Sequence, residues 1–154
     1  MDKEKVYKLI KDYDIGMMTN VNESGKLVSH PMTRQGDIED DVLWFFSERD
    51  SEKTTELKKN NSVNISFSGD DYISVSGTVE IVDDVETKKD LWSKANKTFF
   101  DGGPEDDQVI LLKVNIDSVE YWTSNNILKN AFEFAKGMAT DKDPDLGEND
   151  ALEI

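Results

Sequence analysis

The chain has 154 residues, of which 33% are charged, 36% are hydrophobic and none is cysteine. Its formal net charge of −15 at pH 7 repels phosphate backbones, so we expect no nucleic-acid partner. The absence of cysteine excludes disulfides and thiolate metal sites and favours a cytoplasmic protein. No apolar run reaches the length of about 18 residues that predicts a membrane span, and the N-terminal residues are too charged for a secretory signal.

The N-terminal part of the chain predicts a helix followed by a β-hairpin. Residues 2–12 place apolar side chains at helical spacing among charged ones. Two strand-like runs follow at 15–22 and 26–32, and the sequence Glu-Ser-Gly at 23–25 is typical of a hairpin turn between them.

Another strand and a helix are expected after a loop at 34–41. Residues 42–47 form a continuous apolar run, which is typical of a strand covered on both faces. Residues 51–60 contain good helix formers, and either Asp50 or Ser51 can cap the start of this helix.

Alternating apolar residues predict two further strands at 62–69 and 72–84, joined by a tight turn. Gly77, in the middle of the second of these strands, indicates a bulge or a bend.

The last part of the chain predicts two helices, at 85–99 and 126–138. Between them, residues 108–124 form a long strand-like run with a break near Asp117. The final residues, 139–154, are acidic and punctuated by proline and glycine, which is typical of a flexible tail.

This order of elements predicts a mainly β fold with flanking helices. About six strands joined by short hairpins suit a small antiparallel barrel, closed or partly closed. A doubly wound parallel sheet is disfavoured because the hairpin connections are too short for crossovers. We expect the folded domain to occupy residues 1–138 and the tail to follow it.

The sequence lacks the motifs of common nucleotide-binding and hydrolase sites, including the P-loop, GxGxxG and GxSxG. With one histidine and no cysteine, a nucleophile–histidine pair would need His30, and no nucleophile is spaced to match it. The carboxylates are scattered and do not follow the register of a calcium loop, so no metal site is predicted.

Two segments gather residue types that suit an anion site. The stretch 29–35 (SHPMTRQ) holds the chain's only histidine and an arginine, Arg34. The helix expected at 51–60 offers free backbone N–H groups at its start, with hydroxyls and Lys53 close by. Arg34 could reach this place if the two strands are neighbours. The alternative is that Ser51 is an ordinary helix cap and Lys53 is solvated.

Four stretches of the chain, in this order and at this spacing, match a known pattern. They are HPMTRQ (30–35), LWFFSERDSEKTTELKKN (43–60), VSGTVEIVDD (75–84) and LLKVNIDSVEYW (111–122), the last preceded by FFDGGPEDD (99–107). Together they resemble the FMN-binding split barrels related to pyridoxamine 5′-phosphate oxidase, and most closely the general stress protein branch. The match covers about residues 1–137 and implies a six-stranded antiparallel split β-barrel.

The resemblance also implies a homodimer that binds FMN, or less readily FAD, at the subunit interface. Ser51 and Lys53 match the family's Ser-x-Lys phosphate element, while Tyr121 and Trp122 would pack near the partner's flavin, in the core or in the dimer contact. The residues expected to bind the cofactor are His30, Pro31, Met32, Thr33, Arg34, Phe46, Ser47, Ser51, Lys53 and Trp122.

Three functions remain open on the sequence alone. The resemblance implies a flavin-dependent oxidoreductase with an unassigned small-molecule substrate, because the flavin itself carries the redox chemistry. The protein could instead hold flavin without turnover, as a reservoir or a stress sensor. Finally, Glu48 and Glu52, which flank the phosphate element, could have abolished flavin binding and left a structural dimer. Oxidation of pyridoxamine phosphate is not expected, because no arginine follows Arg49 and no histidine follows His30 to form the oxidase's substrate element.

Overall fold

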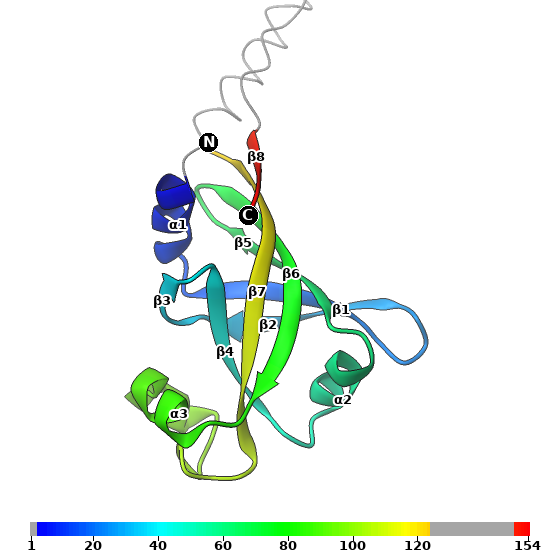
Figure 1. The fold of residues 1–154 in the computed structure, drawn as a ribbon, viewed down its shortest axis with the longest axis vertical. Coiled ribbons are helices and arrows are strands. Elements are labelled where there is room, and N and C mark those ends of the chain that lie inside the picture. Colours follow the sequence, from blue (N-terminus) through cyan, green and yellow to red (C-terminus); the bar gives the residue numbers. More distant parts are fainter. Residues whose placement is uncertain (1–2, 124–149) are drawn as a thin grey trace, which may run out of the picture.

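The computed structural model describes residues 3–123 and 150–154. This part of the chain is mainly β-structure, with short helices around the sheet (Figure 1). The helices are α1 (Lys3–Lys11), α2 (Glu52–Lys59), α3 (Val85–Leu91) and the 3₁₀ helix η1 (Lys94–Thr98). The strands are β1 (Ile15–Val21), β2 (Leu27–Thr33), β3 (Gln35–Glu39), β4 (Val42–Glu48), β5 (Ser62–Ser68), β6 (Tyr72–Val82), β7 (Val109–Trp122) and β8 (Asp150–Glu153).

The order of the strands explains why the sheet curls. Every pair is antiparallel, and the order is β2-β1-β5-β6-β7-β4-β3, with β8 beside β7. β2 and β3 lie at opposite ends of this order, yet only Arg34 separates them in the chain. Because one residue spans at most about 3.6 Å, the two ends of the sheet must meet.

The barrel nevertheless stays open on one side. Within the described residues β2 pairs only with β1, so a seam without ladder hydrogen bonds runs between β2 and β4. A mainly β, antiparallel split barrel is therefore confirmed, with eight strands in place of the expected six.

The inside of the barrel is filled by one continuous cluster of apolar side chains. Alternate residues of β5 and β6 point inward, as the period of two in the sequence predicts, and Ile65 and Phe67 are fully buried. Helix α1 packs onto this core through Val6 and Ile10, which are also fully buried. The core thus holds together strands that are far apart in the sequence.

The bulge expected at Gly77 lies opposite it, on β7. The pairing passes from Ser76↔Ser118 to Gly77↔Ile116, so Asp117 is the extra residue, where the sequence indicated a break. A Cβ atom at position 77 would lie 2.3 Å from the carbonyl oxygen of Asn115. Glycine is therefore needed where β6 approaches β7 at the bulge.

Two expected elements differ in the structure. The predicted loop at 34–41 contains strand β3, which turns into β4 through Asp40 and Asp41, with φ angles of 53° and 60°. The predicted helix at 85–99 is interrupted, because Trp92 has an extended backbone that ends α3 before η1 begins.

The C-terminal residues also form more structure than expected. Within the proposed tail, Asp150–Glu153 form β8, which pairs with β7, and the amide of Ile154 donates to the carbonyl of Asp117 at 2.8 Å. The helix expected at 126–138 lies outside the described residues. Among the described helices, none is long and apolar enough to cross a membrane.

Candidate functional site

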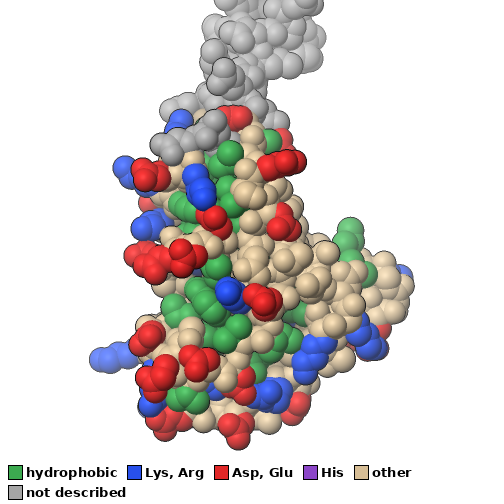
Figure 2. All heavy atoms as spheres, in the orientation of Figure 1, with side chains coloured by type: hydrophobic (Ala, Val, Ile, Leu, Met, Phe, Trp, Pro, Cys, Tyr) green, Lys and Arg blue, Asp and Glu red, His purple; other side chains and the backbone are tan. Residues whose placement is uncertain are grey.

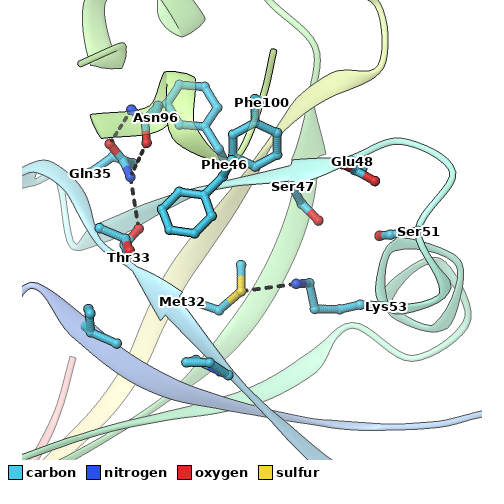
Figure 3. Close-up of a pocket in the computed structure, with 13 residues that line it drawn as sticks. Met32, Thr33, Gln35, Phe46, Ser47, Glu48, Ser51, Lys53, Asn96 and Phe100 are labelled. Atoms are coloured by element: carbon cyan, nitrogen blue, oxygen red, sulfur yellow. Dashed lines mark hydrogen bonds between the residues drawn. The ribbon is translucent and has the colours of Figure 1, made fainter. Parts of the chain in front are cut away.

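The main cavity lies at the seam, where β2 faces β4 and helix α2 begins (Figure 3). Its volume is about 500 Å³, and we call it the seam pocket. Its lining residues come from β1–β4, the start of α2 and the segment around η1: Ile15, Pro31, Met32, Thr33, Gln35, Phe46, Ser47, Glu48, Ser51, Lys53, Asn96, Phe99 and Phe100.

Hydroxyl groups converge at the α2 end of the pocket. Ser51 is the N-cap of α2, and its side chain accepts a hydrogen bond from the amide of Thr54 at 3.2 Å. The Thr54 hydroxyl donates to the carbonyl of Glu48 at 2.7 Å and lies 2.8 Å from Ser51 Oγ and 3.3 Å from Ser47 Oγ. Since the first amides of a helix have no partner within it, this end of the pocket is rich in hydrogen-bond donors.

Lys53 places a positive charge at the same end. Its ammonium lies 3.1 Å from the sulfur of Met32, which is only a weak acceptor. In the described part of the chain, no carboxylate forms an ion pair with it. Burial lowers the pKa of Lys53 below its ordinary value, while the charges of Glu48 and Glu56 oppose this shift. The pocket therefore contains a cation that no carboxylate of the described residues pairs with directly.

The two glutamates flanking the Ser-x-Lys element have different positions. Glu52 is exposed and does not line the pocket, whereas Glu48 is exposed at its rim. Glu56, further along α2, is buried and accepts a hydrogen bond from Asn20 Nδ2 at 2.9 Å. Repulsion of a bound anion therefore comes mainly from Glu48.

The opposite end of the pocket is aromatic. The ring of Phe46 contacts Trp92 edge to face, with centroids 5.2 Å apart, and Phe100 at 6.1 Å. Phe99 is 70% exposed at the side of the pocket formed after η1. This end suits a flat apolar group, while the α2 end suits an anion.

Seven of the ten expected cofactor-binding residues line the seam pocket. They are Pro31, Met32, Thr33, Phe46, Ser47, Ser51 and Lys53. Figure 3 shows most of them converging from β2, β4 and α2, as the two sequence segments indicated.

The other three lie elsewhere. Arg34 turns toward the end of α1, where its guanidinium donates to the carbonyl of Gly36 and, at 3.4 Å, to those of Tyr13 and Lys11. His30 lies on β2 next to Pro31 but does not line the pocket, and its Nδ1 is buried and without a partner among the described residues. Trp122 is half-buried at the far end of β7, opposite Tyr72, and its neighbour Tyr121 lies in the core.

Several lining residues were missed by the sequence analysis. Gln35 is the last residue of the stretch 29–35, so its position in the sequence could have indicated it. Asn96, Phe99 and Phe100 come from a segment predicted as plain helix or loop, which gives no such indication. Ile15 was read only as a strand residue. Within the described residues, no group of three or more acidic, histidine or cysteine side chains could hold a metal ion.

The antiparallel split barrel, with a mixed polar and aromatic pocket at its seam, defines the class of protein. The sequence profile described as "Pyridoxamine 5'-phosphate oxidase like" matches residues 1–145. The chain belongs to the pyridoxamine 5′-phosphate oxidase-like family.

Its relatives include general stress proteins. The chain is 33% identical to protein bli-3 of Neurospora crassa over 142 residues, which cover 82% of this chain and 66%, or just under two thirds, of bli-3. It is similar to the solved general stress protein 26 of Bacillus anthracis, with 30% identity, a TM-score of 0.70 and coverage of 77% of this chain and 92% of that one. The general stress FMN/FAD binding protein of Xanthomonas citri is 27% identical, with a TM-score of 0.66 and coverage of 79% and 88%.

Proposed function

We propose that this protein binds FMN in the seam pocket and uses it for redox chemistry on a small substrate. The observation that carries the proposal is the ammonium of Lys53, which has no ion-pair partner among the described residues and lines the seam pocket together with Ser47 and Ser51, in a chain of net charge −15. A cation at a donor-rich helix start suits a phosphate group. The Xanthomonas citri relative, described as FMN/FAD binding, supports the same ligand class.

The remaining lining residues fit the rest of such a cofactor. A pocket of about 500 Å³ lies within the range of about 300–1,000 Å³ found for small-molecule sites. Pro31, Met32 and Thr33 of β2 and Phe46 of β4 all line it, so a flat ring would lie between this strand and the aromatic side chain. Nδ1 of His30, next along this strand, is buried and has no partner within residues 3–123 and 150–154, so it is a further polar group close to the pocket.

The chain's own residues bind, orient and shield the cofactor, and FMN when bound supplies the capacity to transfer a hydride or electrons. Lys53 and the hydroxyls hold the charged end, which fixes the position of the flat end against β2. Phe46, Phe99 and Phe100 exclude water from that flat end. We propose no role in oxidising pyridoxamine phosphate, because the substrate element of the oxidase has no counterpart in this sequence.

We also propose that the protein acts as a homodimer. The outward-facing residues in the middle of β1, β5 and β6 carry no charge in a chain where 33% of residues are charged; they are Met17, Thr19, Asn64, Ser66, Ser74 and Ser76, which we call the outer sheet face. On the face of the molecule that Figure 2 shows, uncharged side chains and backbone make up a broad area beside groups of charged side chains.

Apolar residues extend the outer sheet face toward the seam pocket. Ile15 is 60% exposed and Met17 is 42% exposed, and Met17 pairs with Pro31, which lines the pocket. A second copy of the chain seated on this face would bury them and cover the flavin site. The dimer and the cofactor are therefore parts of one proposal.

An absorption spectrum of the purified protein, followed by a titration of the apo form with FMN, tests this function. We expect flavin bands and binding of about one FMN per subunit, and then oxidation of reduced nicotinamide when an electron acceptor is supplied. Flavin binding without turnover would instead assign a storage or sensing role. A protein that binds neither FMN nor FAD would contradict the proposal.

A further inference from the structure

A pair of buried amide side chains forms one wall of the seam pocket. Gln35 begins β3 and is 7% exposed, and Asn96 lies in η1 and is 4% exposed. Their amides face each other: Gln35 Nε2 donates to Asn96 Oδ1 at 3.2 Å, and Asn96 Nδ2 donates to Gln35 Oε1 at 3.0 Å. We call these two side chains the amide wall (Figure 3).

All four N–H groups of the amide wall are used inside the protein. Besides the two reciprocal bonds, Gln35 Nε2 donates to the carbonyl of Thr33 at 3.1 Å, and Asn96 Nδ2 donates to Ser93 Oγ at 3.2 Å. Each primary amide has only two N–H groups, so no donor remains.

The surrounding groups also fix which way round the amides lie. The backbone carbonyl of Thr33 can only accept, so Gln35 must turn its nitrogen toward it. Gln35 Oε1 then faces Asn96, so Asn96 must donate a hydrogen bond to it from Nδ2. Rotating either amide would place two acceptors or two donors against each other, so the assignment is determined by the network.

What remains free is the acceptor capacity of the two carbonyl oxygens. In the part of the chain that the structure describes, each accepts one hydrogen bond and can accept a second, and both side chains line the pocket together with Phe46 and Phe100. We propose that the amide wall is a specificity element that offers only acceptors and selects flat ligands carrying an N–H group on their edge. This inference rests on the proposed function, where the N–H group would be N3–H of the flavin.

Burial makes this selection effective. A ligand that lacks the N–H group would exclude the remaining water from the two carbonyl oxygens without supplying a hydrogen bond in its place. Sites built to hydrogen-bond a ligand group reject analogues that lack it more strongly than apolar pockets reject a changed shape.

Titration of the apo protein with FMN and with N3-methyl-FMN, followed by flavin fluorescence, tests the inference. The two ligands share the phosphate and the ring and differ in the N–H group. We expect the unaltered protein to bind FMN about tenfold more tightly, the effect of roughly one to two buried hydrogen bonds. A matched variant, Lys97→Ala, changes an exposed residue of the same 3₁₀ helix and should keep this preference.

The double variant Gln35→Met with Asn96→Leu removes both partners of the amide wall together, which leaves no single amide unsatisfied. We expect it to bind the two flavins with equal affinity. Equal binding of both flavins by the unaltered protein would overturn the inference and leave the proposed function intact, as would a preference that survives in the double variant. Failure of the unaltered protein to bind either flavin would overturn both. Equal binding of the two flavins by the unaltered protein would overturn the inference even if the double variant does not fold.

Discussion

The core of the barrel and the seam pocket are built from the same strands, yet they differ in how completely their apolar side chains are buried and their charged groups are paired. Inside the barrel, Phe67 and its neighbours are fully buried and purely apolar. At the seam, Lys53 has no ion-pair partner among the described residues, and Ile15 and Phe99 are exposed. The buried side-chain atoms without a partner in the described residues, Asn20 Oδ1 and His30 Nδ1, lie on β1 and β2 and outside the lining of the seam pocket.

This difference indicates which part of the molecule is shaped by stability and which by function. Placing a partly buried ammonium without an ion-pair partner costs free energy of folding, so the position of Lys53, which has no such partner in the described residues, needs a reason other than packing. A ligand that supplies the missing partner is such a reason. The two regions should therefore respond differently to substitution.

The largest effect is expected in the core. Phe67→Ala removes a fully buried ring and should lower the free energy of unfolding by about 3–5 kcal/mol. Phe99→Ala, at the exposed edge of the pocket, should change it by less than about 0.5 kcal/mol. Urea denaturation of the apo protein measures both. Similar losses from the two substitutions would show that the seam is part of the structural core.

Lys53→Glu should have the next largest effect, on FMN affinity. It replaces the pocket's cation by an anion facing the phosphate, so we expect affinity to fall by about a hundredfold or more. The matched control is Lys58→Glu, which makes the same change at an exposed position of the same helix outside the seam pocket. Equal loss in both variants would mean that the overall charge, rather than the site, governs binding.

The core was largely predictable from sequence because periodicity reports burial directly. Alternation along 62–69 and 72–84 placed Ile65 and Phe67 in strands whose inward faces are indeed apolar. Strand β3 was missed because Gln35–Glu39 contains one apolar residue, Ile38, and its pairing with β4 depends on the turn at Asp40 and Asp41.

The seam pocket was predictable only in part. The polar end follows from two short segments: 29–35, which holds the only histidine and one of the two arginines, and 43–53, which contains the start of a helix with hydroxyls and Lys53. Its aromatic end depends on the break at Trp92, which returns Asn96 and Phe100 to the seam and leaves no periodic signal. Arg34 shows the converse: a cation in the right segment turns to the carbonyl groups at the end of α1 instead.

A charge on the outer sheet face should affect assembly by a smaller factor. Ser66 lies between Met17 of β1 and Ser74 of β6, so Ser66→Glu places a carboxylate from each copy in the proposed dimer contact. We expect the dimer dissociation constant to rise by about tenfold or more in sedimentation experiments, with weaker FMN binding as a consequence. Ser24→Glu, in the exposed turn before β2, is the control. An unchanged dimer would place the contact elsewhere.

The smallest predicted effect is the dependence on pH that Lys53 confers. Burial lowers its pKa in the folded protein below the ordinary value of 10.5. Between the lowered pKa and 10.5 the unfolded chain binds more protons than the folded one, so the contribution of Lys53 to stability becomes more favourable as pH rises through this window.

FMN should reverse that shift, because a bound phosphate favours the charged ammonium. Above the lowered pKa of the apo protein, binding should therefore take up a fraction of a proton, and affinity should fall as pH rises. Calorimetric titrations at alkaline pH in two buffers of different ionisation enthalpy measure this uptake, and Lys53→Met should abolish it. Equal uptake in the variant would assign the proton to another group and remove Lys53 from the charged end of the site.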